Sequence, residues 1–291
     1  MIDQGITNTK FKDMLSQFCS RQLTDPSIRD WFTGKIGETG SAFFLAFGMV
    51  NKKVPRESTP LDAELIEQFK GTDPAFNPDL WTLDQLCRLA FLMHLPVGAN
   101  SKLISTLLGA ADMREQVVIY KSLQYLDNAE DFVLNAVDGI RTNMIDVFDA
   151  IALNNSYPRK FFSEEAWNQM VLKAIFMERP VFKIVGLDER NNPKLSSILY
   201  DFVHERWAAH RPVTPELWRM TTNYLNDALF DDLKKVIETD TDIAKTVAIK
   251  VISESNFTPA QNWLQDQGFS PSDTTWEEIG HEVWSSAKPQ G

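Results

Sequence analysis

Hydrophobic residues recur at helical spacing along nearly the whole chain. Apolar positions three or four residues apart occur in residues 83–95, 103–108, 140–151, 195–203 and 243–252. This spacing places side chains on one face of an α-helix. Two apolar runs, 117–120 and 181–185, resemble strands, but they are too short and too isolated to form a sheet. The pattern therefore predicts an all-α protein.

Capping residues and prolines mark the expected helix boundaries. Ser163 precedes two glutamates, and Thr214 and Thr258 each precede a proline. Thr274 and Glu277 have the spacing of a capping box. The resulting short helices, joined by short turns, favour an irregular α-α superhelix of HEAT-like helical repeats or a large helical bundle.

No linker rich in glycine and serine interrupts the helical pattern. The sequence therefore predicts one helical domain over residues 1–268. Residues 269–291 are short, acidic and end in a polar tail, so we expect them to form a loosely attached C-terminal segment.

Charge and composition exclude several classes of function. The chain has 29 basic and 40 acidic residues, a net charge of −11, which disfavours nucleic acids and anionic membrane surfaces. Its two cysteines, Cys19 and Cys87, lie far apart in apolar surroundings, which favours buried thiols in a reducing compartment. No signal peptide or membrane-spanning stretch is recognisable, so we expect a cytoplasmic protein.

The common catalytic and cofactor motifs are absent from the sequence. There is no Gly-rich phosphate loop and no nucleophile elbow. His204 and His210 are six residues apart, so on one helix their imidazoles would point in different directions and could not share a metal ion. The sequence therefore predicts no cofactor and no metal, and it favours a protein that is not an enzyme.

Residues 141–219 are dense in amide, aromatic and arginine side chains. On a helix spanning residues 194–210, Arg206 and His210 continue the apolar stripe. A guanidinium on a core-facing line must meet a carboxylate, a carbonyl group or a ligand. Arg206 therefore either pairs with carbonyl groups at the helix end or binds a ligand.

A second group of polar residues follows from a helix predicted over residues 138–154. Asn143, Asp146 and Asn154 would share one flank of that helix, and the chain turns immediately after it. The asparagines could equally cap the helix end, and Trp167 could equally belong to the core. The candidate ligand-binding residues are Asn143, Asp146, Asn154, Asn155, Tyr157, Trp167, Asn168, Arg206 and His210.

Several long stretches of this region resemble the EboA family. The matching stretches are RTNM (141–144), FDAIALNNSYPRKFF (148–162), EAWNQMVLKA (165–174), GLDERNNP (186–193), HERWAAHRPV (204–213) and PELWR (215–219). The resemblance implies a protein of the bacterial ebo gene cluster, which also encodes a prenyltransferase-like membrane protein and enzyme-like proteins. It further implies a part in the traffic of a secondary metabolite or its precursor towards the periplasm. It implies no catalytic residues.

Three hypotheses of function follow. The first is a non-catalytic cytoplasmic protein that binds the metabolite or hands it on for export, with other proteins of the cluster, including the membrane protein, as partners. The second is an enzyme that modifies the metabolite with acid–base residues on helices 138–154 and 194–210. Its acid–base and electrostatic groups would be Asp146, Arg206 and His210 on these helices and Tyr157 in the turn after the first of them. The third is a scaffold for pathway proteins, which the 13 acidic against 6 basic residues from Glu216 onward would suit.

Overall fold

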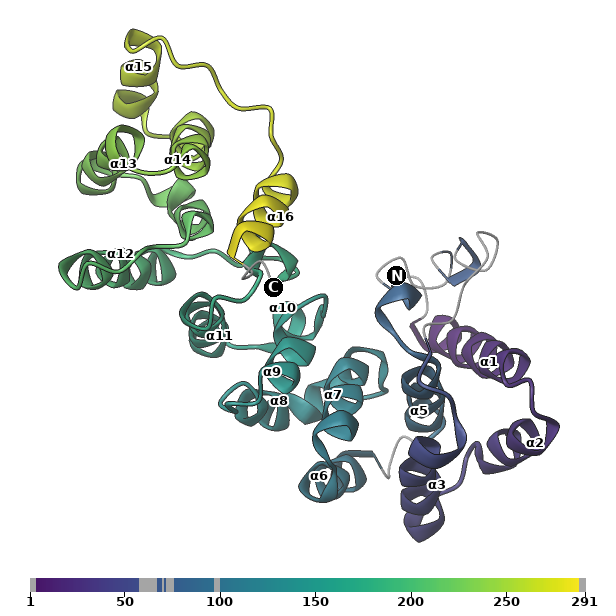
Figure 1. The fold of residues 1–291 in the computed structure, drawn as a ribbon. Coiled ribbons are helices and arrows are strands. Elements are labelled where there is room, and N and C mark those ends of the chain that lie inside the picture. The colour runs from purple at the N-terminus through teal and green to yellow at the C-terminus, as the bar shows by residue number, and fades with distance from the viewer. Residues whose placement is uncertain (1–3, 58–66, 70, 72–75, 97–99, 288–291) are drawn as a thin grey trace. The chain divides into compact units, whose positions relative to one another are not determined.

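The computed structural model describes residues 4–57, 67–69, 71, 76–96 and 100–287, and it is helical throughout (Figure 1). The described residues form α-helices and short 3₁₀ helices and contain no β-strand, so the prediction of an all-α fold is confirmed. The strand-like run 117–120 lies inside helix α7 (Met113–Ser122), and the run 181–185 begins with the 3₁₀ helix η5 (Val181–Lys183). The type of helical repeat stays a prediction.

The chain divides into two compact units, residues 1–151 and 152–291. The sequence predicted one domain over residues 1–268, without a boundary near residue 151. In the residues described, no helix has the length and apolar character needed to cross a bilayer.

The first unit is organised around helix α5 (Leu83–Met93). This helix packs against α1 (Gln4–Gln22), α3 (Gly40–Lys53) and α7, and nearly all of its residues are buried. A helix that is buried on all sides needs apolar residues around its whole circumference. Most positions of α5 are apolar in this way. Other helices among the described residues of this unit are α2 (Pro26–Lys35), η1 (Pro78–Leu80), α6 (Asn100–Ala110), η3 (Leu123–Tyr125), η4 (Ala129–Phe132), α8 (Val133–Gly139) and α9 (Ile145–Ala152), which ends at the boundary.

Helix α5 also carries a buried charge. The Arg88 side chain is fully buried, and its Nη1 donates to Asp84 Oδ2 at 3.0 Å. Its Nε donates to the backbone oxygen of Phe47 at 3.2 Å, and its guanidinium lies 5.3 Å from the centre of the Phe47 ring. Glu115 of α7 lies further away, with 3.9 Å between its Oε1 and Arg88 Nη2. Arg88 thus joins α3, α5 and α7 inside the core.

The second unit places a 3₁₀ helix at its centre. Helix η6 (Pro215–Tyr224) packs against α12 (Pro193–Ala208) and α14 (Asp242–Glu254), and its Leu217 and Trp218 are buried. Side-chain caps begin α12 at Asn192 and α14 at Thr241. The other helices of this unit are α10 (Tyr157–Phe161), α11 (Glu164–Phe176), α13 (Asp227–Thr239), α15 (Thr258–Asp266) and α16 (Trp276–Ala287).

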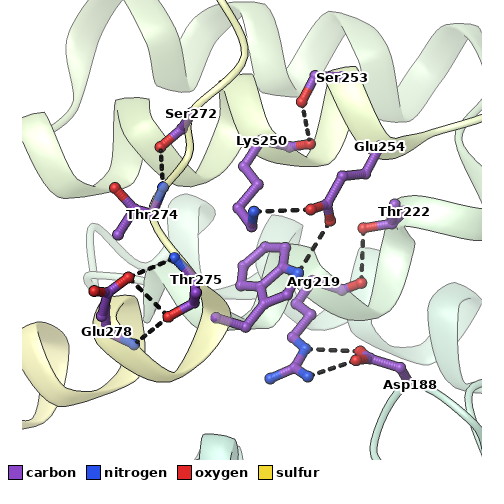
Figure 2. A network of polar contacts seen from close by, with 11 residues as sticks. Asp188, Arg219, Thr222, Lys250, Ser253, Glu254, Ser272, Thr274, Thr275 and Glu278 are labelled. Carbon is purple, nitrogen blue, oxygen red and sulfur yellow. Dashed lines mark hydrogen bonds and ion pairs between the residues drawn. The ribbon is translucent and has the colours of Figure 1, made fainter.

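Helix α16 packs against η5, η6 and α14. At its start, the Trp276 ring lies 5.2 Å from the Arg219 guanidinium and 5.6 Å from Lys250 Nζ, and its Nε1 donates to Glu254 at 3.0 Å. Figure 2 shows the surrounding network, in which Arg219 also pairs with Asp188. Ile279 is fully buried. These contacts differ from the loose attachment predicted for residues 269–291, of which 288–291 lie outside the described residues.

The capping box of α16 is displaced by one residue from the prediction. Thr275 and Glu278 form it: the Thr275 amide donates to Glu278 Oε2 at 2.7 Å, and the Glu278 amide donates to Thr275 Oγ1 at 3.2 Å (Figure 2). Thr274 and Glu277, which the sequence suggested, have the same spacing. Spacing alone therefore did not distinguish the two pairs.

Two helices differ in their bounds from the prediction. The helix predicted over 138–154 is interrupted, because α8 ends at Gly139 and α9 begins only at Ile145. Between α8 and α9, the Thr142 hydroxyl accepts a hydrogen bond from the Met144 amide, and this bond stabilises a turn. The predicted helix 194–210 ends at Ala208, and His210 has a left-handed φ of 54°. His210 therefore does not continue the apolar stripe of that helix.

Candidate ligand-binding cavity

The second unit contains a cavity of about 430 Å³. Helices α11, α12, η6, α14 and α16 all contribute to its wall. Slightly more than half of the lining residues are apolar: Ile175, Phe176, Phe202, Pro212, Val213, Pro215, Ile243, Val283 and Trp284. The polar lining residues are Glu178, Arg179, Arg206, Thr214, Glu216, Asp240, Thr241 and Ser286. Small-molecule sites commonly combine apolar walls of this extent with a few polar groups.

Glu216 is a buried acid in the cavity wall. Pro215 begins η6, which places Glu216 in the first turn of that helix, where its side chain is 4% exposed. Its Oε1 accepts the Phe182 amide at 3.1 Å. Burial raises the pKa of Glu216 to about 7, although the Phe182 amide and the Arg219 charge act in the opposite direction. Near neutral pH this carboxyl can therefore either donate or accept a hydrogen bond.

Two arginines in the wall are held by aromatic rings. The Arg206 guanidinium lies 5.9 Å from the Phe202 ring centre, and the Arg179 guanidinium lies 5.0 Å from that of Trp284. Arg206 Nε and Nη2 both donate to the Pro212 backbone oxygen, at 2.9 and 2.8 Å. A carbonyl group just beyond the helix is thus a partner of Arg206, and the same side chain lines the cavity.

A second hollow of about 660 Å³ adjoins the cavity. It shares Pro212 and Asp240 with the cavity wall. Its other lining residues are Trp207, His210, Arg211, Lys235, Val236 and Thr239. Of the predicted site residues, Arg206 therefore lines the cavity and His210 lines the adjoining hollow.

Other predicted residues of the second unit have partners inside the fold. Asn155 Oδ1 accepts a hydrogen bond from the Tyr157 backbone amide at 2.9 Å, and the Asn154 backbone amide donates to the Lys183 backbone oxygen at 2.8 Å. Tyr157 and Trp167 are buried. Asn168 is buried as well and exchanges two hydrogen bonds with the side chain of Asn192 at 2.8 and 3.1 Å. These contacts show how the residues shape the fold, and their part in ligand binding stays a prediction.

The segment 186–193 explains why amide and arginine side chains are dense here. Arg190 donates to the backbone oxygens of Pro158, Arg159 and Phe162 at the end of α10, and its guanidinium lies 5.0 Å from the Trp167 ring centre. The Asn191 amide group donates to the Met220 oxygen at 2.8 Å. The segment thus ties α10, α11 and η6 together.

Asn143 and Asp146 belong to the first unit and are exposed there. Asn143 lies in the turn before α9, and Asp146 lies in the first turn of that helix. Among the residues described, no group of three or more His, Cys, Asp or Glu side chains is placed to hold a metal ion.

Several residues of the cavity wall are not predicted from the sequence. Glu216, Arg179 and Trp284 come from segments that meet only in the folded second unit. The stretch PELWR contained a usable signal, because an acid directly after a helix-starting proline and before Leu217 and Trp218 lies next to the core. Ile243 and Trp284 offered no such local signal.

The raised pKa of Glu216 predicts an unusual pH dependence of stability. Between about pH 4.5 and 7 the folded state binds this proton more tightly than the unfolded chain does. Stability from this group is therefore present at low pH and is lost as the pH rises through 7, with a loss of about 3 kcal/mol. Glu216→Gln keeps an acceptor for the Phe182 amide but cannot ionise.

We expect Glu216→Gln to gain stability relative to the wild type as the pH rises from 5 to 8, measured by urea unfolding. Glu282→Gln, at an exposed glutamate of α16, is the control and should follow the wild type. Parallel pH profiles for Glu216→Gln and the wild type would contradict the assignment.

The residues described form an all-α protein whose second unit contains a partly apolar cavity. The family model for the metabolite traffic protein EboA matches residues 11–222. This match covers most of the chain, which therefore belongs to the EboA family. No curated protein and no solved structure matches the chain significantly. The family match includes Glu216 and Arg206, whereas the cavity residues from 240 to 286 lie beyond it.

Proposed function

We propose that this protein is a non-catalytic cytoplasmic carrier. It binds a secondary metabolite or its precursor in the cavity of the second unit and hands it on for export to the periplasm. The family description as a metabolite traffic protein supports the general role. The finer statement depends on one observation, the cavity of about 430 Å³ with apolar walls and the buried Glu216.

The character of the wall favours binding. Aromatic and aliphatic side chains offer area for an apolar body, and the removal of that area from water supplies most of the affinity. Glu216 and Thr214 offer hydrogen bonds that orient the molecule inside the cavity. The other proteins of the same gene cluster, including the prenyltransferase-like membrane protein, are the proposed partners in transfer.

Retention of the metabolite through purification tests this proposal. The protein is isolated from its own host and examined by native mass spectrometry. We expect a bound species of discrete mass that is released on denaturation. A protein that carries no small molecule when it is taken from cells that make the metabolite would contradict the proposal.

One observation favours a second candidate function, the modification of the metabolite. A general acid or base needs a pKa close to the working pH, and Glu216 meets this condition inside the cavity. If Glu216 acts in this way, Glu216→Gln should still bind the metabolite but release it chemically unchanged. Identical metabolites released from the variant and the wild type would exclude this second function.

A further inference from the structure

The cavity and the adjoining hollow differ in character. The cavity wall is slightly more apolar than polar, and its two arginines, Arg179 and Arg206, lie against aromatic rings. The hollow gathers three side chains that can carry positive charge, His210, Arg211 and Lys235. The two spaces share Pro212 and Asp240 in their walls and are therefore neighbours in the second unit.

The hollow gathers basic side chains on a protein that is acidic as a whole. The net charge of the protein is −11, yet the side chains of Arg211, His210 and Lys235 are exposed at one place. His210 and Arg211 are adjacent in sequence, and the left-handed φ of His210 turns the chain directly after α12. Exposed cationic side chains that acids do not fully neutralise can attract an anionic group even when the whole protein is acidic.

The neighbouring acids leave part of this charge available. Lys235 Nζ pairs with Asp232 Oδ1 at 3.0 Å, and the other oxygen of Asp232 lies 2.7 Å from His204 Nε2. Asp240 is exposed in the shared wall, and its Oδ1 accepts the Thr241 amide at 2.7 Å. Asp240 therefore opposes an anion in the hollow, whereas Arg211 and His210 favour one.

We propose that the bound molecule is an amphiphile, with an apolar body in the cavity and an anionic head group against His210, Arg211 and Lys235. The inference rests on the proposed binding function and names the chemical class of the ligand. Trp207 forms an apolar edge of the hollow beside these charges. The head group can be a carboxylate or a phosphate, because both accept hydrogen bonds from arginine.

A series of probes with one chain and different head groups tests this proposal. Decanoate, decyl phosphate, decanol and decylamine share an apolar chain and differ in charge. Their dissociation constants are measured by titration calorimetry and by tryptophan fluorescence, since Trp284 and Trp207 line the two spaces. We expect one or both anions to bind at least tenfold more tightly than decanol, and decylamine to bind most weakly. The stronger of the two anions identifies the head group.

Charge variants of the hollow separate the head group from the apolar body. Arg211→Gln should weaken binding of the preferred anion about tenfold and leave decanol unchanged. Asp240→Asn keeps an acceptor for the Thr241 amide and should tighten binding of the anion. Lys160→Gln, at an exposed lysine elsewhere in the second unit, is the control. Added salt should weaken binding of the anion to the wild type more than binding to Arg211→Gln.

The failure of this inference differs from the failure of the proposed function. If decanol and the anions bind equally, and Arg211→Gln changes neither, the cavity binds apolar molecules and the head-group assignment is wrong. Preferred binding of decylamine would also overturn it. If none of the probes binds and native mass spectrometry finds no retained metabolite, the binding function itself fails.

Discussion

Arg88→Met is expected to lower the free energy of unfolding of the first unit by about 3–5 kcal/mol. The guanidinium is fully buried, and its removal leaves the Asp84 carboxylate without its charged partner. Asp84 itself is only 7% exposed, and it also accepts a hydrogen bond from the Thr82 hydroxyl. The Phe47 backbone oxygen also loses a donor. A buried charge without a partner costs more than the ion pair contributes.

Urea unfolding followed by circular dichroism measures this change. The double variant Arg88→Met/Asp84→Leu should recover much of the loss, because it removes both buried charges. Arg141→Met is the matched control, since Arg141 forms an exposed pair with Asp138 whose loss should cost less than about 1 kcal/mol. Equal stability of Arg88→Met and Arg141→Met would contradict the role assigned to Arg88.

Ile243→Trp is expected to abolish retention of the metabolite, with a loss of affinity of at least about 100-fold, or roughly 3 kcal/mol. Ile243 is half-buried at the start of α14, and its side chain lines the cavity. An indole ring in its place occupies space that the ligand needs. Because the cavity offers that space, the variant should fold with little strain, unlike a variant enlarged inside a packed core.

Ile198→Trp provides the control for this variant. Ile198 is also half-buried in the second unit, on α12, but it does not line the cavity. Native mass spectrometry of both variants from the host should show the metabolite on Ile198→Trp and not on Ile243→Trp. Retention by a folded Ile243→Trp protein would show that the metabolite binds elsewhere.

The sequence predicted those features that depend on local periodicity and capping. The apolar spacing in residues 83–95 predicted α5, and Ser163 was identified as the start of α11. The apolar spacing did not predict the interruption between α8 and α9. The turn there is stabilised by a hydrogen bond from the Met144 amide to the Thr142 hydroxyl, and apolar spacing carries no information about such a bond. The family was also recognisable, because its stretches are long and specific.

The cavity itself could be predicted only in small part. Arg206 was identified because its position on the helix required a partner, and both a carbonyl group and a cavity lie beside it. Asn168 and Trp167 drew attention by their residue types, but they contact Asn192 and Arg190 inside the fold. Glu216, Ile243 and Trp284 meet only through tertiary packing. A helical wheel describes the faces of one helix and cannot show which side chains of different helices come together.

A crystal structure of the protein purified from its own host, with the metabolite retained, tests the central claim most directly. We expect density for a small molecule in the cavity between α12, η6, α14 and α16, in van der Waals contact with Phe202 and Trp284. A polar atom of that molecule should lie within hydrogen-bonding distance of Glu216. Density for the metabolite at another place on the protein, with only ordered water in the cavity, would show that the cavity is not the binding site.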